Sequence, residues 1–379
     1  MSTTLRYIAG GMSGTSADGV DVAIVAIDGR GYDMTARLVV HHHRPYNAEL
    51  RRQIFAFRNG GAGSVSQDTL RALAEMGREI SLTYAAAVNE ALAAAQMEAK
   101  NLAAVAAHGQ TLFHDPPNTI QWLDPSLIAA EVGCAVVSDF RRADLAAGGQ
   151  GAPLVPFADF ILFRDATKNR VLLNLGGIAN ITWLPAGATI DQVIAFDTGP
   201  ANCISDHVCR KMDPSGPGYD AGGARARRRI AEHRDILLAA KFLSDPYFAK
   251  PPPKSADTPA MIARFEQVVG PAQLSFDDQL AVACHITGLS VIAAYGFLPA
   301  RADEVIVSGG GTKNAAMLQA LDDVPPLRST DELGVPSDAK EAIAFALLAA
   351  ATLDGVPSNV PSVTGAKRPV VLGSITPRP

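Results

Sequence analysis

Near-continuous hydrophobic runs, most of them bounded by glycine, recur along the first 140 residues of the chain. They read YIAGG, VDVAIVAID, ARLVV, LAAVAAHG and AVVSDF. Runs with so few polar interruptions are typical of strands that are buried on both faces of a sheet. They predict a central sheet that is covered by helices.

Between these runs the hydrophobic period changes to three or four residues. From about Asp68 to Gln96 the apolar positions are Leu70, Leu73, Ile80, Tyr84, Val88 and Leu92. This spacing places them on one face of a helix and predicts a single long amphipathic helix. Another helix is predicted in SDAKEAIAFALLAAATL, with Ser337 as its N-cap.

The second half of the chain repeats this plan. RVLLNLGGIANITWL predicts a strand, a glycine turn and a second strand, and VIAFDTG and DEVIVSGGG predict two further strands. A chain of 379 residues is long enough for two domains, each with its own core. We therefore predict two similar α/β domains that face each other across a cleft.

The composition is ordinary for a soluble globular enzyme, with 48% hydrophobic and 19% charged residues. A net charge of −5 offers no electrostatic reason to expect nucleic acid or an anionic membrane as a partner. The densest basic stretch, RARRRIAEHR, is interpreted as the solvated start of a helix. We find no secretion signal and no uninterrupted apolar stretch near the roughly 20 residues needed to cross a bilayer, and we predict a cytoplasmic protein.

Two groups of potential metal ligands are interpreted as structural. His41, His42 and His43 follow the run ARLVV and are interpreted as a strand end in solvent rather than a metal site. The cysteine spacing fits neither a zinc site nor a small disulfide scaffold and predicts buried, reduced thiols. The four cysteines are Cys134, Cys203, Cys209 and Cys284.

Three glycine-rich turns, each directly after a predicted strand, carry the strongest chemical signal. They are GGMSGTSADG, NLGGIAN and SGGGTKN. Glycine lets the backbone approach a ligand closely, and successive N–H groups in such turns form an anion site to which Ser and Thr hydroxyls add donors. The first turn is neither a Walker A loop, since no Gly-Lys-Ser/Thr follows, nor a dinucleotide fingerprint, since a strand follows it. One such turn alone is commonly just a turn, but three of them favour a bound nucleoside polyphosphate.

The predicted nucleotide contacts follow from the order of the turns. The first two turns would clamp the β- and γ-phosphates, and the third would suit the nucleoside end. Asp18 and Asp21 could orient Mg²⁺ directly or through water, although a local hydrogen bond on the strand is an equal alternative for Asp21. The predicted contacts are Gly14, Thr15, Ser16, Asp18, Gly19, Asp21, Gly176, Gly177, Asn180, Gly309, Gly310, Gly311 and Asn314.

In their order along the chain, these motifs resemble the anhydro-N-acetylmuramic acid kinase family, within the actin-like ATPase superfamily that includes sugar kinases. The matching stretches are GMSGTSADGVDVA, AAHGQTLFH, VVSDFRRADLAAGGQGAPLVP, NLGGIANIT, FDTGPANC, VSGGGTKNAAML and SDAKEAIAFALLA. The resemblance implies two actin-like (ribonuclease H-like) domains, each a mixed five-stranded sheet with flanking helices. Domain I would hold residues 1–145 and 337–379, and domain II residues 146–336. A homodimer is also implied.

The resemblance further implies a reaction, in which ATP phosphorylates O6 of 1,6-anhydro-N-acetylmuramic acid while the anhydro bridge is cleaved, as part of cell-wall sugar recycling. In ordinary phosphoryl transfer an aspartate accepts the proton of a free hydroxyl. Here O6 has no proton to lose, so a base must activate water to attack C1 and release O6. Asp197, at the end of the strand AFDTG, stands at the family's catalytic position. The alternative is that Asp197 caps a helix that begins in PANCISDHVC.

The resemblance also places four polar residues at the sugar. Arginine suits a lactyl carboxylate or a bridging oxygen, an amide and a hydroxyl suit sugar hydroxyls, and a glutamate suits a hydroxyl or the N-acetyl N–H. As alternatives, Glu341 would only favour a helix N-terminus, and Arg141 would pair with Asp139 or Asp144. The four residues are Gln110, Thr111, Arg141 and Glu341.

The chain departs from the family pattern in a few places. KSADTPAMIARF keeps Lys254 and Ser255 but lacks the Thr-Gly-Arg-Glu that usually follows, and Leu123 and Ala201 replace common glycines. These changes bear on a lid and on the sugar preference. Two other functions therefore stay open: a kinase of the same fold acting on a free hydroxyl of another amino sugar or hexose, and a nucleotide-gated structural protein, for which no polymer interface or peptide-binding module is found.

Overall fold

The computed structural model describes residues 5–60, 66–232 and 236–379 and shows two compact units. Unit 1 consists of Met1–Leu162 and Gly334–Pro379, and unit 2 of Phe163–Leu333. The expected boundaries at 145/146 and 336/337 therefore shift, because residues 146–162 pack on unit 1. The Tyr32 ring lies 6.2 Å from that of Phe160, and Lys340 forms a buried ion pair with Asp159 at 2.8 Å.

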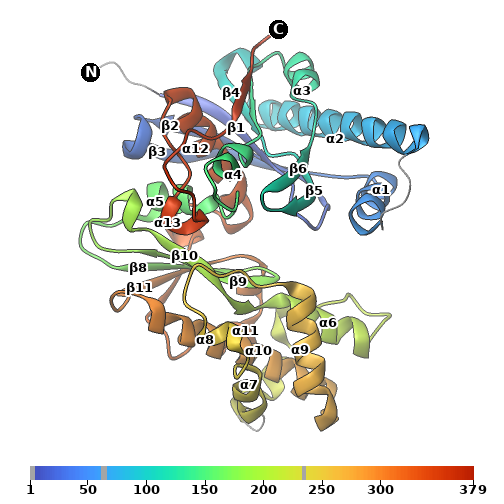
Figure 1. The fold of residues 1–379 in the computed structure, drawn as a ribbon, viewed down its shortest axis with the longest axis vertical. Coiled ribbons are helices and arrows are strands. Elements are labelled where there is room, and N and C mark those ends of the chain that lie inside the picture. The colour runs from blue at the N-terminus through green and yellow to red at the C-terminus, as the bar shows by residue number, and fades with distance from the viewer. Residues whose placement is uncertain (1–4, 61–65, 233–235) are drawn as a thin grey trace. The chain divides into compact units, whose positions relative to one another are not determined.

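Unit 1 is built on a six-stranded sheet in the order β13-β7-β4-β1-β2-β3 (Figure 1). Strands β1, β2 and β3 are antiparallel, β4 and β7 run parallel to β1, and β13 is antiparallel to β7. The sheet has one strand more than predicted, because the C-terminal tail adds β13 at its edge. The bounds are β1 Arg6–Met12, β2 Gly19–Asp28, β3 Thr35–Pro45, β4 Leu102–Ala107, β7 Val136–Ser138 and β13 Ser374–Thr376.

Two long helices cover the opposite faces of this sheet. A Cβ on Gly10 of β1 would lie 1.9 Å from the Ala342 carbonyl oxygen of α12 (Lys340–Asp354), and one on Gly11 would lie 3.1 Å from the Tyr84 ring of α2 (Gln67–Ala94). Consecutive strand residues point to opposite faces, so α12 and α2 lie on opposite sides. The long amphipathic helix predicted from Asp68 to Gln96 is confirmed as α2. The second predicted helix begins at Lys340, after a 3-10 turn, so Ser337 is not its N-cap.

Unit 2 has a five-stranded sheet in the order β10-β9-β8-β11-β12. Strands β8, β9 and β10 are antiparallel, and β11 and β12 run parallel to β8. When the strands are counted within each sheet, both sheets share the order 3-2-1-4-5, β13 aside. This repeated topology confirms the predicted actin-like, ribonuclease H-like fold. The bounds are β8 Arg170–Leu175, β9 Ile178–Leu184, β10 Ile194–Pro200, β11 Glu304–Ser308 and β12 Leu327–Ser329.

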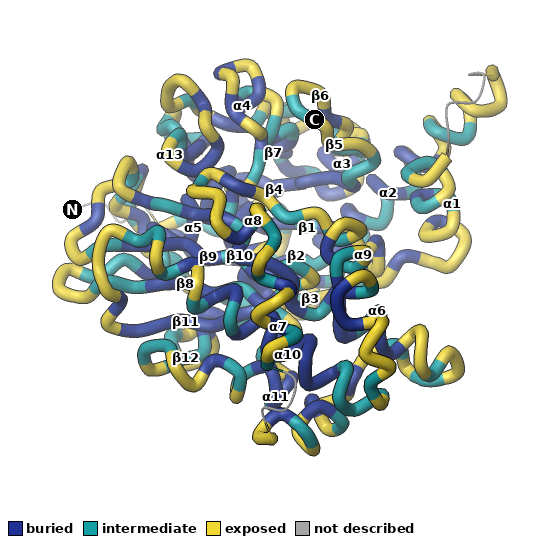
Figure 2. Tube along the Cα trace, turned by 60° about the horizontal axis from the view of Figure 1, so that its bottom comes forward, coloured by how far each residue is buried: buried dark blue, intermediate teal, exposed yellow. Residues whose placement is uncertain are grey.

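Helix α10 (Phe276–Ala294) is the core helix of unit 2 and packs against β10 and α6 (Asn202–Met212). The stretch Phe276–Phe297 is long and apolar enough to cross a membrane, but 67% of its most apolar window is buried in the fold. The stretch is interrupted by Asp277, Asp278 and His285, so it agrees with the expectation that no uninterrupted apolar run is that long. Figure 2 shows that the strands are largely buried too, and that many exposed residues lie in the loops.

The remaining elements connect and flank the two sheets. A separate hairpin pairs β5 (Gln110–Asp115) with β6 (Asn118–Trp122). The other α-helices of the described residues are α1 Ala48–Asn59, α3 Pro125–Val132, α4 Arg142–Ala146, α5 Val155–Phe163, α7 Ile236–Phe242, α8 Pro246–Ala249, α9 Thr258–Val268, α11 Ala315–Gln319 and α13 Pro361–Thr364.

The predictions for cysteine and for the basic stretch have different outcomes. All four cysteines are free and buried, as predicted. The basic stretch forms 3-10 turns instead of the start of a helix, and its last residues, 233 and 234, lie outside the described residues. Arg225 and Arg228 each pair with Asp277 at 3.0 Å, so one carboxylate offsets part of the positive charge of this stretch.

Candidate active site

The first glycine-rich turn joins β1 to β2 at the end of the unit 1 sheet. Thr15, Ser16 and Asp18 are exposed, and the Ser16 hydroxyl donates to Asp18 Oδ1 at 2.8 Å. The Ala17 N–H donates to the Gly14 carbonyl at 3.2 Å, which closes the turn. The turn therefore presents hydroxyls and one carboxylate to solvent on a hydrogen-bonded backbone.

Gly19 and Gln110 are buried next to this turn. Gly19 is buried at the start of β2, where a Cβ would lie 2.3 Å from the Arg44 carbonyl oxygen. Gln110 is fully buried; its Oε1 accepts from the Ser13 hydroxyl at 2.7 Å, and its Nε2 donates to the Gly14 carbonyl at 3.0 Å. Its amide thus holds the first turn, and its role as a sugar contact stays a prediction.

The second and third glycine turns lie next to each other in unit 2. Gly176 and Gly177 join β8 to β9, and their carbonyls accept from the backbone N–H groups of residues 201–203 at the start of α6. Gly309 follows β11 with a φ of 89°, and a Cβ there would lie 2.8 Å from the Leu175 carbonyl oxygen. The prediction that each turn directly follows a strand is confirmed.

Asn314 has a structural task at the third turn. Its side chain is 7% exposed, and its Oδ1 accepts from the N–H groups of Ala316 and Met317 at 3.1 Å. It is therefore the N-cap of α11. Its role as a nucleoside contact stays a prediction. Gly310, next to Gly309, lies at the exposed part of the turn.

A row of polar residues crosses four strands of the unit 2 sheet just before these turns. Ser308 of β11 pairs with Asn174 of β8, Asn174 with Asn180 of β9, and Asn180 with Asp197 of β10. Cross-strand partners carry their side chains on the same face. The register therefore places Asn180 beside Asp197, next to the turn at Gly176.

Asp197 is a half-buried carboxylate with one oxygen already engaged. Its Oδ2 accepts from the Ala256 N–H at 2.9 Å, so the alternative in which it caps α6 is wrong. Within the described part of the chain, Oδ1 has no protein hydrogen bond and is not among the buried unpaired oxygens. Burial raises the pKa of Asp197 to about 6, against a smaller lowering by the Ala256 N–H. A pKa near the working pH suits a general base.

Arg141 is oriented by a neutral histidine in unit 1. Arginine donates only, so His108 Nε2 accepts from Arg141 Nε at 3.2 Å and Nη2 at 2.8 Å, and His108 Nδ1–H donates to the Gly109 carbonyl at 2.8 Å. Burial and the Arg141 charge lower the pKa of His108 to about 3. It is Arg142 that pairs with Asp139, and Asp144 accepts from the Gly151 N–H, so the ion-pair alternatives for Arg141 are wrong.

Glu341 stands in the first turn of α12, within electrostatic reach of Arg141 and Asp21. The pKa of Glu341 is raised, mainly because the surrounding protein desolvates the carboxylate. The charge of Asp21 also raises this pKa, whereas the charges of Lys340 and Arg141 lower it. Thr111 is held in the hairpin, where its hydroxyl donates to Gln121 Oε1 at 2.6 Å. The structure thus brings Arg141, Glu341 and Asp21 together in one charged region of unit 1.

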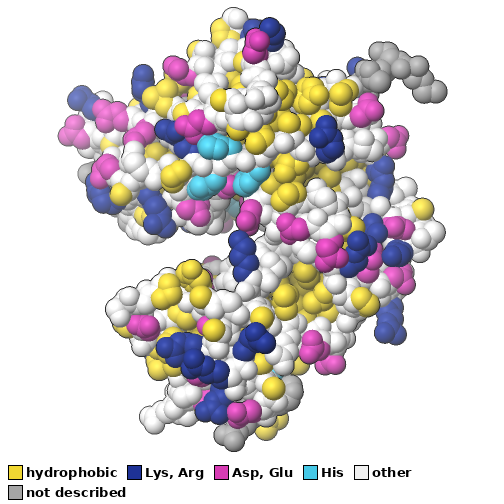
Figure 3. Space-filling model, turned by 180° about the vertical axis from the view of Figure 1, so that it is seen from behind, with side chains coloured by type: hydrophobic (Ala, Val, Ile, Leu, Met, Phe, Trp, Pro, Cys, Tyr) yellow, Lys and Arg dark blue, Asp and Glu magenta, His cyan; other side chains and the backbone are white. Residues whose placement is uncertain are grey.

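Asp21 is engaged by two histidines of the neighbouring strand. Its Oδ1 lies 3.0 Å from His41 Nε2 and 3.1 Å from His43 Nδ1. Burial raises the pKa of Asp21, but hydrogen bonds and charge from both histidines lower it overall. The alternative in which Asp21 makes a local hydrogen bond on its strand is therefore part of its role. Figure 3 shows histidine side chains gathered beside acidic ones on one face.

Asp18 and Asp21 are suited to a Mg²⁺ ion that is held mainly by water and by substrate phosphates. The described residues contain no cluster of three or more His, Cys, Asp or Glu side chains that could hold a metal. Mg²⁺ usually keeps several waters and binds through one or two carboxylates plus substrate phosphates. Asp18 and Asp21 fit that role through water, with Oδ1 of each already hydrogen-bonded.

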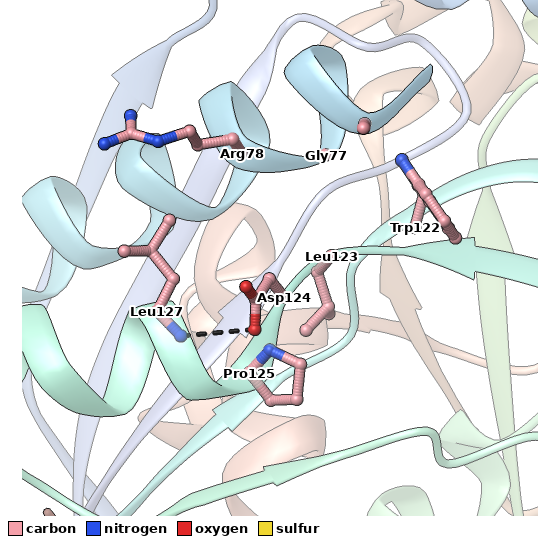
Figure 4. A pocket seen from close by; sticks show the side chains of 8 residues that line it. Gly77, Arg78, Trp122, Leu123, Asp124, Pro125 and Leu127 are labelled. Carbon is pink, nitrogen blue, oxygen red and sulfur yellow. Dashed lines mark hydrogen bonds between the residues drawn. The ribbon is translucent and has the colours of Figure 1, made fainter. Parts of the chain in front are cut away.

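A pocket of about 430 Å³ lies between α2 and the start of α3 (Figure 4). It is lined mainly by apolar groups, and Asp124 at its wall already caps α3 by accepting from the Leu127 N–H at 3.2 Å. Leu123 also lines it and packs behind the turn at Gly109. None of the predicted site residues opens into this pocket.

Sequence reasoning missed the residues that support the site. Ser13, Asn174 and Ser308 look like ordinary strand-end polar residues, and only register and burial give them a place. His108 belongs to the same group, since its Nε2 accepts from Arg141 and thereby orients that side chain. The sequence signal for His108 is a histidine directly before a glycine, at the end of a predicted strand.

A family model and three relatives from different organisms share one description. A family model described as anhydro-N-acetylmuramic acid kinase matches residues 6–378. A protein of that name from Salinibacter ruber is 42% identical over 391 residues, which cover 98% of this chain and 96% of its own length. Proteins of the same name from Bacillus cereus and Caldanaerobacter subterraneus are 37% and 34% identical over 98% of this chain, and over 99% and 97% of their own lengths.

Proposed function

Because the chain belongs to the anhydro-N-acetylmuramic acid kinase family, we propose that it opens the 1,6-anhydro ring of anhydro-N-acetylmuramic acid by hydrolysis and phosphorylates O6. The chain is a phosphotransferase of the sugar-kinase type that uses ATP, and the ring opening is the proposed part. The product would be N-acetylmuramic acid 6-phosphate, a step in recycling cell-wall sugar. The observation that carries the proposal is the Asp197 carboxylate, with one free oxygen, beside the polar row and the glycine turns of unit 2.

Asp197 would act as the general base. Its free oxygen Oδ1 takes a proton from water, the water oxygen bonds to C1, and the C1–O6 bond breaks. O6 then takes the γ-phosphoryl group and ADP leaves; the proton on Asp197 is later lost to solvent. General-base catalysis by a positioned carboxylate contributes about 10²- to 10⁴-fold, so the rest must come from positioning and charge stabilisation.

Each unit would supply a separate part of the machinery. In unit 1 the turn at Gly14, Thr15 and Ser16 would hold phosphate oxygens, and Arg141 and Glu341 would contact the lactyl carboxylate and the sugar's polar groups. In unit 2 the turns at Gly176 and Gly309 would hold the rest of the nucleotide. Bound Mg²⁺ would neutralise charge on the phosphates, with Asp18 and Asp21 orienting its water.

A comparison of acceptors tests this function. Purified protein with ATP and Mg²⁺ is incubated with either 1,6-anhydro-N-acetylmuramic acid or N-acetylmuramic acid, which has a free 6-hydroxyl, and the products are identified by mass. We expect phosphorylation with uptake of one water on the anhydro sugar, at a kcat/KM at least tenfold above that for the free sugar. Faster phosphorylation of the free 6-hydroxyl sugar or of a hexose would contradict the proposal and favour an ordinary hydroxyl kinase.

A further inference from the structure

A short segment of unit 2 lies against the edge strand that carries Asp197. β10 is the end strand of its sheet, so one side of its backbone has no strand partner. The Lys254 carbonyl accepts from the Asp197 N–H at 3.2 Å, and the Tyr247 hydroxyl donates to the Asp197 carbonyl at 2.6 Å. With the bond from the Ala256 N–H to Oδ2, the segment 247–256 contacts the backbone and the carboxylate of Asp197 at three points.

The Lys254 side chain is buried without an acidic partner. It is 7% exposed, and its Nζ lies 4.7 to 5.7 Å from the ring centroids of Phe196, Tyr247 and Phe297. Its hydrogen-bond partners are the carbonyls of Tyr247 and Phe248, at 3.3 and 3.4 Å. Among the described residues no carboxylate pairs with it, and burial, followed by the charge of Lys250, lowers its pKa.

Burying an ammonium group costs free energy unless the surrounding groups compensate, and cation–π contacts supply only part of that. The neighbouring exposed Lys250 shows that a lysine in this segment can remain in solvent. What Lys254 does instead is join α8, β10 and the residues after α10, the three elements around the Asp197 backbone. A lysine that served only for solubility would not be placed here.

We propose that Lys254 and Tyr247 are positioning residues of the reaction: they fix the segment 247–256 on β10 so that the Ala256 N–H holds Oδ2 of Asp197 and leaves Oδ1 free to take the proton. This inference rests on the proposed role of Asp197. It assigns a task to the lysine of KSADTP, which the sequence left without one. Neither residue touches the reacting atoms; both act through Asp197.

The test compares Lys254→Ala and Tyr247→Phe with the matched control Lys250→Ala, all in the full chain. Tyr247→Phe keeps the ring near Lys254 and removes only the hydroxyl, so the protein should stay folded. We expect kcat to fall at least tenfold for Lys254→Ala and about threefold or more for Tyr247→Phe, with KM for ATP within twofold of the parent. In Lys254→Ala the acid limb of kcat should move to higher pH, because the Ala256 N–H no longer favours the charged carboxylate.

Unchanged kcat and an unchanged acid limb in folded Lys254→Ala would overturn the inference. If Lys254→Ala does not fold, Tyr247→Phe decides: parental kcat there overturns it, and a loss in kcat without a change in KM supports it. Asp197→Asn, assayed in parallel, separates the two proposals. Activity in Asp197→Asn removes the base itself, whereas an inactive Asp197→Asn with fully active Tyr247 and Lys254 variants removes only the positioning role.

Discussion

Asp197→Asn is expected to abolish turnover, with a loss of about 10²- to 10⁴-fold or more, while ATP still binds. Asparagine keeps an oxygen that can accept from the Ala256 N–H, so the local geometry survives, but it cannot take a proton from water. Turnover is measured with the anhydro sugar, and ATP binding by calorimetry. The control is Asp191→Asn, which changes an exposed aspartate of the same unit and should leave turnover at the parental level. Near-normal turnover in Asp197→Asn would remove this residue from the role of base.

The same variant is expected to be more stable than the parent at neutral pH. The pKa of Asp197 is raised in the folded protein from 3.8 to about 6, so the charged carboxylate costs folding free energy once the pH exceeds the unfolded value. A shift of this size corresponds to at most about 3 kcal/mol above pH 6; the difference is small at pH 4 and disappears near pH 2, where both states are protonated. Urea unfolding at pH 7.5 and pH 4 measures the gain. Equal stability of parent and variant at pH 7.5 would show that burial does not destabilise the charged form of Asp197.

Gly10→Ala is expected to unfold unit 1 or to destabilise it by about 3 kcal/mol or more. The added Cβ would lie 1.9 Å from the Ala342 carbonyl oxygen and 2.7 Å from the Ala346 nitrogen, and both are backbone atoms that cannot move alone. Helix α12 would have to lift off β1, and it carries Glu341. Hydrogen exchange followed by mass spectrometry reads the two units separately and should show loss of protection in β1 and α12.

The matched control for Gly10→Ala is Gly296→Ala. No heavy atom lies within 4 Å of a Cβ at Gly296, so this change should alter the free energy of unfolding by less than about 0.5 kcal/mol. Parental protection of β1 and α12 in Gly10→Ala would contradict the close packing of helix and strand.

Much of the fold could be predicted from local patterns. Hydrophobic period alone places α2 to within about two residues, and the three glycine turns stand where the runs end. The sixth strand of unit 1 could not be predicted, because β13 has three residues and pairs with β7, more than 230 positions earlier. The unit boundary moved for a similar reason, since the Lys340–Asp159 ion pair joins residues far apart in the chain.

The site was harder to predict than the fold, because a sequence does not show whether a polar group is already used. Gln110 and Asn314 are polar residues beside glycine turns, yet the Gln110 amide holds the first turn and Asn314 caps α11. Asp197 and Ala256 are 59 positions apart, so their hydrogen bond leaves no sequence signal. Thr15 and Ser16 are exposed, as the predicted phosphate contact requires, and that contact stays a prediction.

The most direct test of the account follows the oxygen of water. The reaction is run with 1,6-anhydro-N-acetylmuramic acid, ATP and Mg²⁺ in H₂¹⁸O and quenched quickly, and unlabelled product kept in the same water measures exchange at the anomeric carbon. The account predicts one ¹⁸O at C1 of the sugar phosphate above the exchange control and none in the phosphoryl group, with all labelling lost in Asp197→Asn. A product without ¹⁸O at C1, or label in the phosphate, would contradict attack of water on the anomeric carbon.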